Sequence, residues 1–552
     1  MDIYLGIDFG AENIMVSYKI DDNSQIYNIE FNGKNHLKNC YAFTNNEEYF
    51  GDDAIDKFLE SNNTNEFVFI DKYKQDLVKT DEKIDKNKYE KLRPKQILIK
   101  MLTHIKNETE NHLRTNRKIE DFNLTNSVIT IPVAWKLKPD IIEVYKIAMQ
   151  KAGFKKFQIE SEPVAAAADI ISTSITNYES IGLEKAPQAS DTILLVDIGS
   201  STLDVNLCTY SKPIRTEVGN GNEFAGNYFD ALVCSKSKKT FLEKLLSFRN
   251  EYFDELLDFK DIKESPRKIA KELRQNTPLG KEIKTATTKY IDTVATSIQK
   301  IVQELIRTSN HEQIDYFVVC GGMSQYDGEN FLERLFQKSQ KLLPYVLNKT
   351  ILINKNNKSK SLLYEAIVHG ATLLAKDPQL VTKNIPYHLG IIVKTEEGTE
   401  TERNTTRNPI VLLKKGTPLK YTTQKYSLRD RLVEVGLINN ASTSTKGHST
   451  SHLRTEMFTD KKEAIEIFLA DTDEDQGKYN FKNSPTEIID FDLTDDYDKE
   501  SVKDLDIDIL FYIDKNNIIN FDIVDFQNEQ SLIAKGKFQK FIEAEKTLNI
   551  RI

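Results

Sequence analysis

Two distant segments of this chain share one short pattern, in which an apolar, strand-like run ends in an acid and a glycine. The first is Ile7–Gly10 (IDFG), close to the N-terminus, and the second is Val196–Gly199 (VDIG). A glycine at such a turn lets backbone N–H groups approach phosphate oxygens closely, and an acid at a strand end can hold Mg²⁺ through water. Because each loop opens an α/β half of its own, the pair predicts a nucleotide bound between two lobes.

The bulk properties of the chain exclude several other classes of protein. With 552 residues, 39% of them hydrophobic, the chain has material for several folded domains. Its net charge is −9 and its acidic and basic residues are interspersed, so no basic face for nucleic acid is expected. No run approaches the roughly 18 apolar residues of a membrane span, and the N-terminal MDIYLGIDFG lacks the basic start of a signal peptide. We therefore expect a cytoplasmic protein with no nucleic-acid or membrane partner.

Residues 1–376 alternate strand-like and helix-like segments, which is typical of an α/β domain. Strands are expected at Ile3–Ile7, Ser127–Ile131, Thr192–Val196 and Tyr316–Cys320. Helices are expected at Asp140–Ala152, Pro163–Ile171, Lys289–Thr308 and Leu362–Ala375. Between about residues 231 and 287 the strand pattern gives way to Lys/Glu-rich helical periodicity, which indicates a helical insertion. The only tryptophan, Trp135, is interpreted as a core aromatic on or near its strand.

After residue 376 the sequence pattern changes from alternating strands and helices to short strand-like runs. Residues 377–384 are expected to form a linker. Residues 385–526 contain short alternating runs separated by turn-forming residues, the pattern of an all-β domain. Strands are expected there at Ile465–Leu469, Ile507–Tyr512 and Ile518–Val524. The remaining residues, 527–552, are a short tail with room for one helix at most.

Further segments of the first domain carry a resemblance to a known family. In Val319–Gly322, a strand runs into a Gly-Gly turn, where an adenosine could lie flat against the backbone. Four more segments contribute. Val128–Trp135 is a strand followed by a proline, and Ala152–Ala168 contains a Glu-Pro-x-Ala-Ala-Ala helix start. Gly219–Asp230 is a glycine-containing loop, and Glu365–Ala371 is a Glu-Ala-x-x-x-Gly-Ala helix. Together with the two acid–glycine loops they resemble the actin-like ATPase superfamily, and within it the DnaK-type branch of the 70-kDa heat-shock proteins.

The second domain resembles the same family in the order of its motifs. Pro386–Ile391 (PYHLGI), Leu412–Thr423 and Ile507–Ile523 are similar to strands and a hairpin of the family's peptide-binding domain. The resemblance implies an α/β, actin-like, two-lobed ATPase domain over residues 1–376 and an all-β sandwich that binds peptides over residues 385–526. The family's full helical lid is not expected, because only the tail 527–552 follows.

The resemblance also implies roles for single residues. Asp8 and Asp197 match the acids near Mg²⁺ and the attacking water, and would hold the metal through water. Glu162 matches the acid that couples the metal site to a switch proline. Lys74 is the best match for the lysine on the γ-phosphate, with Lys72 as its rival. The catalytic residues implied are Asp8, Lys74, Glu162, Asp197 and Thr202.

Contacts to ATP or ADP are implied for residues of all three loops and for two residues elsewhere. They are Gly10, Ala11, Glu12, Asn13, Gly199, Ser200, Ser201, Asp204, Gly226, Lys281, Gly321, Gly322 and Met323. Some depart from the family pattern: Ala11-Glu12 replaces two hydroxyl residues, Ser200-Ser201 replaces two glycines, and Met323 replaces a serine. A desolvated, unpaired Glu12 would oppose a triphosphate by roughly a few kcal/mol.

These features favour an ATP-binding, slowly ATP-hydrolysing molecular chaperone that binds extended or unfolded peptides under nucleotide control. The family implies unfolded clients and a co-chaperone or nucleotide-exchange factor as partners, and a monomer or weak oligomer is expected. Two alternatives stay open. One is a nucleotide-sensing scaffold of the same fold with weak catalysis, and the other, less favoured, is a small-molecule kinase of the actin-like superfamily.

Overall fold

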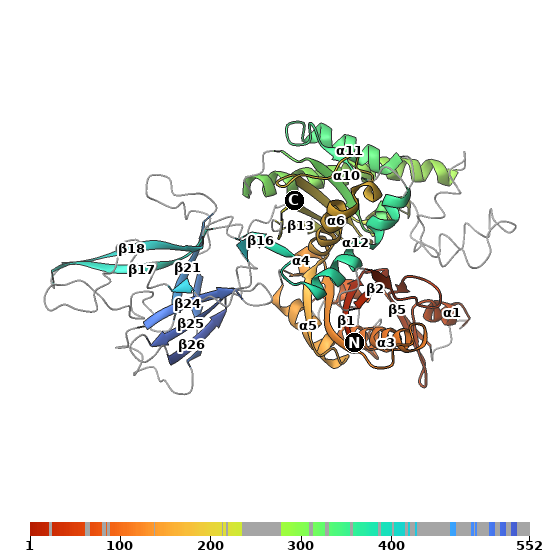
Figure 1. Cartoon of the computed structure of the whole chain (residues 1–552), viewed down its shortest axis with the longest axis horizontal. Coiled ribbons are helices and arrows are strands. Elements are labelled where there is room, and N and C mark those ends of the chain that lie inside the picture. Colours follow the sequence, from red (N-terminus) through yellow and green to blue (C-terminus); the bar gives the residue numbers. More distant parts are fainter. Residues whose placement is uncertain are drawn as a thin grey trace. The chain divides into compact units, whose positions relative to one another are not determined.

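The computed structural model of the chain divides into two compact units, Met1–Val381 and Thr382–Ile552 (Figure 1). The division falls inside the segment 377–384 that the sequence suggests as a linker. The structure describes residues 1–384 except 21–24, 61–66, 80–83, 85–88, 137, 212, 217–218, 235–277, 309–312, 326–329 and 354–356, and beyond residue 384 it describes the strands named below. Most of the expected helical insertion at 231–287 therefore lies outside the described residues.

The first sheet of the N-terminal unit is built around the buried strand β1. This strand forms an antiparallel hairpin with β2 and pairs in parallel with β8, which in turn pairs in parallel with β9. The strand order is β3-β2-β1-β8-β9, with β4 paired to β2. The strands are β1 (Asp2–Phe9), β2 (Asn13–Ile20), β3 (Ile26–Asn28), β4 (Leu37–Lys38), β8 (Asn123–Ile131) and β9 (Phe157–Ser161). Asp8 is thus the penultimate residue of a central strand, at its carboxyl end.

The second sheet repeats this arrangement. Its strand β10 forms an antiparallel hairpin with β11 and pairs in parallel with β14, as β1 does with β2 and β8. The described strands of this sheet within the N-terminal unit are β10 (Thr192–Ile198), β11 (Leu203–Thr209), β12 (Ile214–Thr216), β13 (Asn220–Asn222), β14 (Tyr316–Cys320) and β15 (Ile351–Leu352). Asp197 is directly opposite Asp204 in the hairpin and beside Cys320 of the parallel strand.

Helices and a small antiparallel sheet surround these two sheets. The small sheet has the order β6-β5-β7, from β5 (Cys40–Phe43), β6 (Glu48–Phe50) and β7 (Val68–Asp71). The helices are α1 (Asp52–Glu60), α2 (Tyr73–Asp76), α3 (Pro94–Thr115), α4 (Val133–Lys136), α5 (Pro139–Lys151), α6 (Glu162–Asn177), α7 (Gly226–Cys234), α10 (Pro278–Thr308), α11 (Phe331–Leu342) and α12 (Asn357–Lys376), with 3-10 turns η1 (Tyr178–Ile181) and η3 (Gly322–Gln325). Within the described part of the chain, none of the helices has the length and apolar character needed to cross a lipid bilayer.

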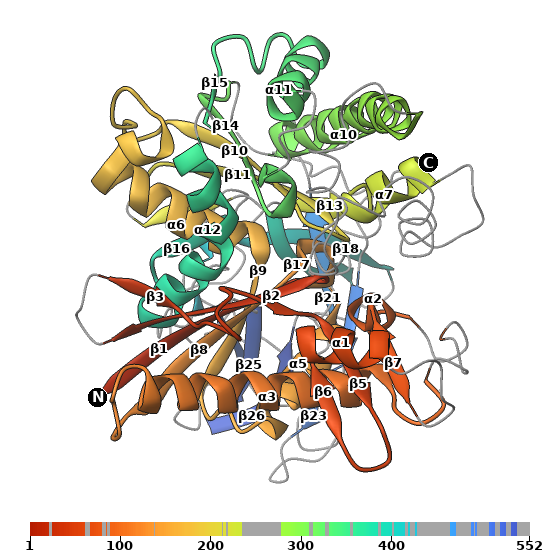
Figure 2. The ribbon, with the colours of Figure 1, turned by 90° about the vertical axis from the view of Figure 1, so that its right-hand side faces the viewer.

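Helices α6 and α12 pack against each other between the two sheets (Figure 2). α12 is fixed to the first sheet by a buried pair of hydroxyls, Ser17 Oγ and Thr372 Oγ1, which lie 2.6 Å apart. Gly370 permits the close approach of α6, because a Cβ atom there would lie 1.7 Å from the Ala165 carbonyl oxygen. The two helices therefore hold the two acid–glycine hairpins in a defined relation to each other.

The C-terminal unit is described through its strands, which pair antiparallel in the orders β18-β17-β21-β22 and β20-β24-β25-β26-β23. The bounds are β16 (Val381–Asn384, which spans the division), β17 (His388–Thr399), β18 (Glu402–Leu413), β19 (Pro418–Leu419), β20 (Tyr426–Ser427), β21 (Ala464–Ala470), β22 (Glu487–Asp490), β23 (Asp492–Leu493), β24 (Ile507–Ile513), β25 (Ile519–Asp525) and β26 (Ser531–Lys537). Ile509, Leu510 and Val524 of the central pair are buried.

The fold differs from the sequence expectation in two places. Ser531–Lys537 forms strand β26 against β25, where the tail was expected to hold one helix at most. The edge of β25 offers backbone partners that a local reading of the tail cannot show. The 22-residue helix α3 was also not named among the expected helices, although its buried residues, from Ile97 to Leu113, recur at helical spacing.

Candidate functional site

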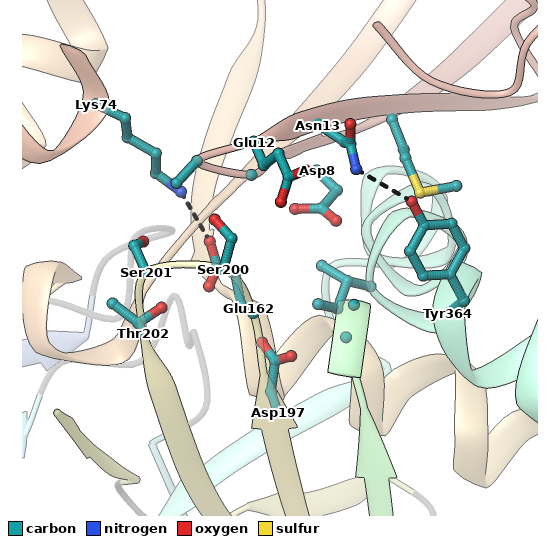
Figure 3. A pocket seen from close by; sticks show the side chains of 17 residues that line it. Asp8, Glu12, Asn13, Lys74, Glu162, Asp197, Ser200, Ser201, Thr202 and Tyr364 are labelled. Atoms are coloured by element: carbon teal, nitrogen blue, oxygen red, sulfur yellow. Dashed lines mark hydrogen bonds and ion pairs between the residues drawn. The ribbon is translucent and has the colours of Figure 1, made fainter. Parts of the chain in front are cut away.

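A pocket lies between the β1–β2 hairpin and the β10–β11 hairpin, and it encloses about 590 Å³ of space, open solvent included (Figure 3). The hairpins, α2, the start of α6, the turn after β14 and α12 form its walls. The lining residues are Asp8, Gly10, Ala11, Glu12, Asn13, Met15, Lys74, Glu162, Asp197, Gly199, Ser200, Ser201, Thr202, Gly321, Gly322, Tyr364 and Ile367. Both acid–glycine loops therefore face one pocket.

The first loop is braced by the segment that follows β4. Asn39 Nδ2 donates to the Gly10 carbonyl oxygen at 2.7 Å, and the Asn39 N–H donates to the Glu12 carbonyl oxygen at 2.8 Å. A Cβ atom at Gly10 would lie 2.3 Å from the Asn13 carbonyl oxygen, so this turn requires glycine. The turn is tight enough for its backbone to approach an anion closely.

Glu12 has a positively charged neighbour that its place in the sequence does not reveal. Its Oε1 lies 3.5 Å from Lys38 Nζ, and the two side chains are 31% and 11% exposed, respectively. Glu12 lines the pocket (Figure 3), but it is neither fully desolvated nor unpaired. The repulsion that a glutamate at this position would exert on a phosphate is therefore reduced.

The second loop is held by the N-terminal end of α7. The Gly199 N–H donates to the Thr202 carbonyl oxygen at 3.0 Å and so closes the turn. The Gly226 N–H donates to the Gly199 carbonyl oxygen at 3.0 Å, and the Asn227 N–H donates to the Ser200 carbonyl oxygen at 2.6 Å. Gly226 thus supports the loop through its backbone and does not line the pocket.

Lys74 of α2 carries a buried ammonium group at the edge of the pocket. Its Nζ lies 3.1 Å from Glu162 Oε1, and the two side chains are 1% and 7% exposed (Figure 3). Lys72 is exposed, has a φ of 52° and does not line the pocket. Of the two candidate lysines, the fold directs Lys74 to the site.

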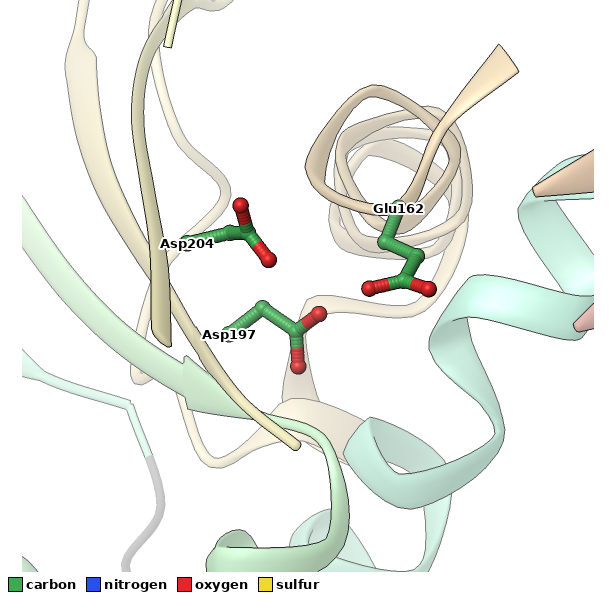
Figure 4. A group of neighbouring side chains, drawn as sticks. All are labelled: Glu162, Asp197 and Asp204. Atoms are coloured by element: carbon green, nitrogen blue, oxygen red, sulfur yellow. The ribbon is translucent and has the colours of Figure 1, made fainter. Parts of the chain in front are cut away.

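Three carboxyl groups gather beneath the second loop (Figure 4). Glu162, Asp197 and Asp204 are all buried, and each offers an oxygen that lies within 4.8 Å of the others. Asp204 Oδ1 accepts a hydrogen bond from the Val133 N–H at 3.1 Å. The sequence resemblance placed the metal at Asp8 and Asp197; the fold groups Asp197 with Glu162 and Asp204, while Asp8 lines the same pocket.

Burial and crowding change the acidity of these groups. Burial, and next the charge of Glu162, raise the pKa of Asp8 to about 7 and the pKa of Asp204 to about 8. The same two causes raise the pKa of Asp197 well above its ordinary value. Lys74 acts in the opposite direction on all three pKa values. Confined acids that outnumber one ammonium group would be stabilised by a divalent cation.

The donors present fit Mg²⁺. Asp197 Oδ1 is buried and has no hydrogen-bond partner within the described residues, so it is available as a ligand atom. Carboxylate oxygens are the ligands that Mg²⁺ takes from proteins, usually together with several waters. The pocket beside Asp8 and Asp197 leaves room for such waters.

Of the residues expected to contact the adenosine, the structure places only some at the pocket. Gly321 and Gly322 line the pocket. Gly321 has a φ of +77°, and a Cβ atom there would lie 2.2 Å from Asp197 Oδ1, so both the turn and the acid require glycine. Met323 is fully buried in the apolar core below and does not line the pocket. Lys281 lies in α10, and its side chain is outside the described residues.

Three lining residues were not expected from the sequence: Met15, Tyr364 and Ile367. Asn13 Nδ2 donates to the Tyr364 hydroxyl at 3.5 Å, which ties the first loop to α12. Tyr364 immediately precedes the Glu-Ala-x-x-x-Gly-Ala segment, so its position beside that motif was the only feature of the sequence that pointed to it as a site residue. Its direction toward the pocket depends on how α12 packs, which the motif alone does not specify.

Two acid–glycine hairpins, a buried lysine–glutamate pair and a group of buried acids thus lie around one pocket of the N-terminal unit. The family model described as Hsp70 protein matches residues 4–311, more than half of the chain. The chain therefore belongs to the Hsp70 family. Its N-terminal unit has the actin-like ATPase fold with mixed sheets that this family implies.

Two chaperones are similar to this chain. Chaperone protein DnaK of Mesomycoplasma hyopneumoniae (strain 232) is 31% identical over 206 residues, which are 37% of this chain and 30% of that protein. The chaperone protein HscA homolog of Rickettsia conorii (strain ATCC VR-613 / Malish 7) is 25% identical over 338 residues, 58% of this chain and 51% of that protein. The chain thus spans at most about half the length of these curated relatives.

The Lys38–Glu12 pair leads to a prediction about nucleotide affinity. Lys38→Met is expected to weaken ATP binding by about 10- to 100-fold, because Glu12 is left beside the phosphates without its counter-charge. The double variant Lys38→Met/Glu12→Thr should recover most of the affinity. Titration calorimetry with ATP and Mg²⁺ measures both. Lys34→Met is the matched control, since Lys34 pairs with Asp52 instead; equal losses in the single and double variants would contradict the prediction.

Proposed function

We propose that this protein is an ATP-binding molecular chaperone that hydrolyses ATP slowly and binds extended or unfolded peptides under nucleotide control. The observation that carries the proposal is the pocket that both glycine loops, the Lys74–Glu162 pair and the buried acids Asp8 and Asp197 line together. Family membership supports it, because Hsp70 proteins bind ATP and ADP and the two relatives named above are chaperones.

Each part of the pocket has a role in this proposal. The loops at Gly10 and Gly199 would bind phosphate oxygens through backbone N–H groups. Asp8 and Asp197 would hold Mg²⁺ through water, and bound Mg²⁺ would neutralise phosphate charge. Lys74 would bring a buried positive charge to the γ-phosphate. The Thr202 hydroxyl hydrogen-bonds the Asp204 carboxyl group and so supports the acids from behind.

We assign peptide binding to the C-terminal unit. Its described strands pair antiparallel throughout, and the pair β24–β25 has a buried interior. This supports the β-sandwich that the motif order suggests, with Ile507–Ile523 as a late strand pair. Unfolded or extended peptides would bind this unit, and co-chaperones or a nucleotide-exchange factor would act on the first.

One observation favours a second function, a nucleotide-sensing scaffold of the same fold. Glu12 places a carboxylate in the pocket wall where the family has a hydroxyl residue. Even when paired with Lys38, this group lowers the positive potential available to a triphosphate. A protein altered in this way could bind nucleotide and change shape with little hydrolysis.

The rate at which a bound peptide dissociates separates these functions. A fluorescent, extended apolar peptide is bound first, and its release is followed without nucleotide, with ADP and with ATP, all with Mg²⁺. A chaperone should release it about tenfold or more faster with ATP, within the usual range of coupling between two sites. Nucleotide binding with unchanged peptide release would support the scaffold. Transfer of phosphate to added glycerol would support a kinase and contradict both.

A further inference from the structure

Trp135 lies against the buried lysine of the site. It belongs to α4, and its side chain is 6% exposed. Lys74 Nζ lies 5.3 Å from the centroid of its ring, within the range of a cation–π contact. The same ammonium group is 3.1 Å from Glu162 Oε1. The sequence indicates only a core aromatic at this position, so the contact comes from the fold.

We propose that Trp135 is a positioning residue that holds the Lys74 ammonium group between its ring and the Glu162 carboxylate, ready for a phosphate. This inference rests on the proposed function, in which Lys74 meets the γ-phosphate. A second carboxylate in place of the ring would also hold the lysine, but it would add a negative charge to the one that Glu162 already supplies. An aromatic face attracts a desolvated cation through its quadrupole and carries no net charge. The ring thereby fixes the direction of Lys74 and adds no negative charge of its own that would repel an anion.

The helix that carries Trp135 also contacts the acids of the second hairpin. The first residue of α4, Val133, donates its N–H to Asp204 Oδ1 at 3.1 Å. The Trp135 N–H donates to the Pro132 carbonyl oxygen at 3.0 Å, which closes the turn between the two contacts. One short turn thus touches the phosphate lysine on one side and an acid of the metal group on the other. A change in the position of Lys74 should therefore change the surroundings of the Trp135 ring.

The chain contains a single tryptophan, so its fluorescence reports on the surroundings of this one ring. Without nucleotide, Lys74→Met removes a charge a few Å from the indole ring and is expected to change the emission spectrum. Lys72→Met is the matched control, because Lys72 is exposed and lies outside the pocket; it should leave the spectrum unchanged. This comparison needs no nucleotide, so it tests the contact even if the proposed ATPase function fails. Identical spectra of the natural protein and Lys74→Met would overturn the proposal.

Replacing the ring tests whether the contact positions Lys74. Trp135→Phe keeps an aromatic face, whereas Trp135→Leu removes it. With Trp135→Leu, single-turnover ATP hydrolysis should fall about tenfold or more, while ATP affinity changes by less than about threefold, because a misdirected group costs rate more than binding. Trp135→Phe should keep most of the natural rate. Thermal melting identifies any variant that fails to fold. Two folded variants with equal rates would overturn the positioning role, and absence of hydrolysis in the natural protein would instead contradict the proposed function.

Discussion

Asp197→Asn is expected to reduce single-turnover ATP hydrolysis by about a hundredfold or more while ATP binding is retained. The substitution keeps the shape of the side chain but removes a carboxylate whose Oδ1 is buried and has no hydrogen-bond partner in the described structure. Loss of one preorganised electrostatic group at a reacting centre lowers the rate by about two to three orders of magnitude. Radiolabelled ATP with enzyme in excess measures the chemical step, and calorimetry measures binding separately.

The stability of the same variant provides the control. Burial, and then the charges of Glu162, Asp204 and Asp8, raise the pKa of Asp197, so its ionised form is unfavourable in this site. Removing that charge should leave the melting temperature equal or higher, and a loss of hydrolysis could not then be attributed to unfolding. Hydrolysis that persists in Asp197→Asn would refute the assigned role. Tight ATP binding without hydrolysis in either protein would leave the nucleotide-sensing scaffold.

Lys74→Met is expected to lower the free energy of unfolding by about 3–5 kcal/mol at pH 8, the usual cost of leaving a buried charge without its partner. The partner here is Glu162, and Asp8, Asp197 and Asp204 are close enough for Lys74 to lower their pKa values as well. Without the ammonium group, these acids would share a buried site with no cation. Chemical denaturation in the presence of EDTA, at several pH values, measures the loss.

The pH dependence of that loss has a defined sign. The folded pKa values of Asp8 and Asp204, about 7 and about 8, lie above the ordinary value of 3.8. Their contribution to stability is therefore fully present below about pH 4 and is lost as the pH rises toward 8. Lys74→Met should deepen this decline, so the variant should approach the natural protein in stability at acidic pH.

Lys72→Met is the matched control, because the exposed Lys72 lies two residues from Lys74. A surface substitution of this kind should change stability by no more than about 0.5 kcal/mol. Equal losses of stability in Lys72→Met and Lys74→Met, or a loss in Lys74→Met that does not depend on pH, would show that the buried Lys74–Glu162 pair does not stabilise the N-terminal unit.

Much of the site could be predicted from the sequence, because its key residues follow buried strands. An apolar run that ends in Asp-x-Gly predicts both the strand and the direction of the acid at its end, as at Asp8 and Asp197. The helix start at Glu162-Pro163 is similarly local, since proline is favoured at the first positions of a helix. In the fold, both acids and Glu162 face the same pocket.

Other features could not be predicted because they join residues far apart in the chain. Lys72 remained a rival to Lys74 in this lysine-rich stretch, and the fold distinguishes the two by burying Lys74 beside Glu162, 88 residues away. Strand β26 likewise depends on the free edge of β25, not on the tail's own pattern.

The sequence by itself determined the order of strands and helices around the two loops, because alternation of apolar residues specifies which face of each element is buried. It also determined which acids end the two central strands. Only the tertiary structure decided how the charges of the site are balanced: Lys38 beside Glu12, Lys74 between Glu162 and Trp135, and Asp204 under Val133. The energy of a charge depends on its desolvation and on its neighbours within a few Å, and those are set when distant segments pack together.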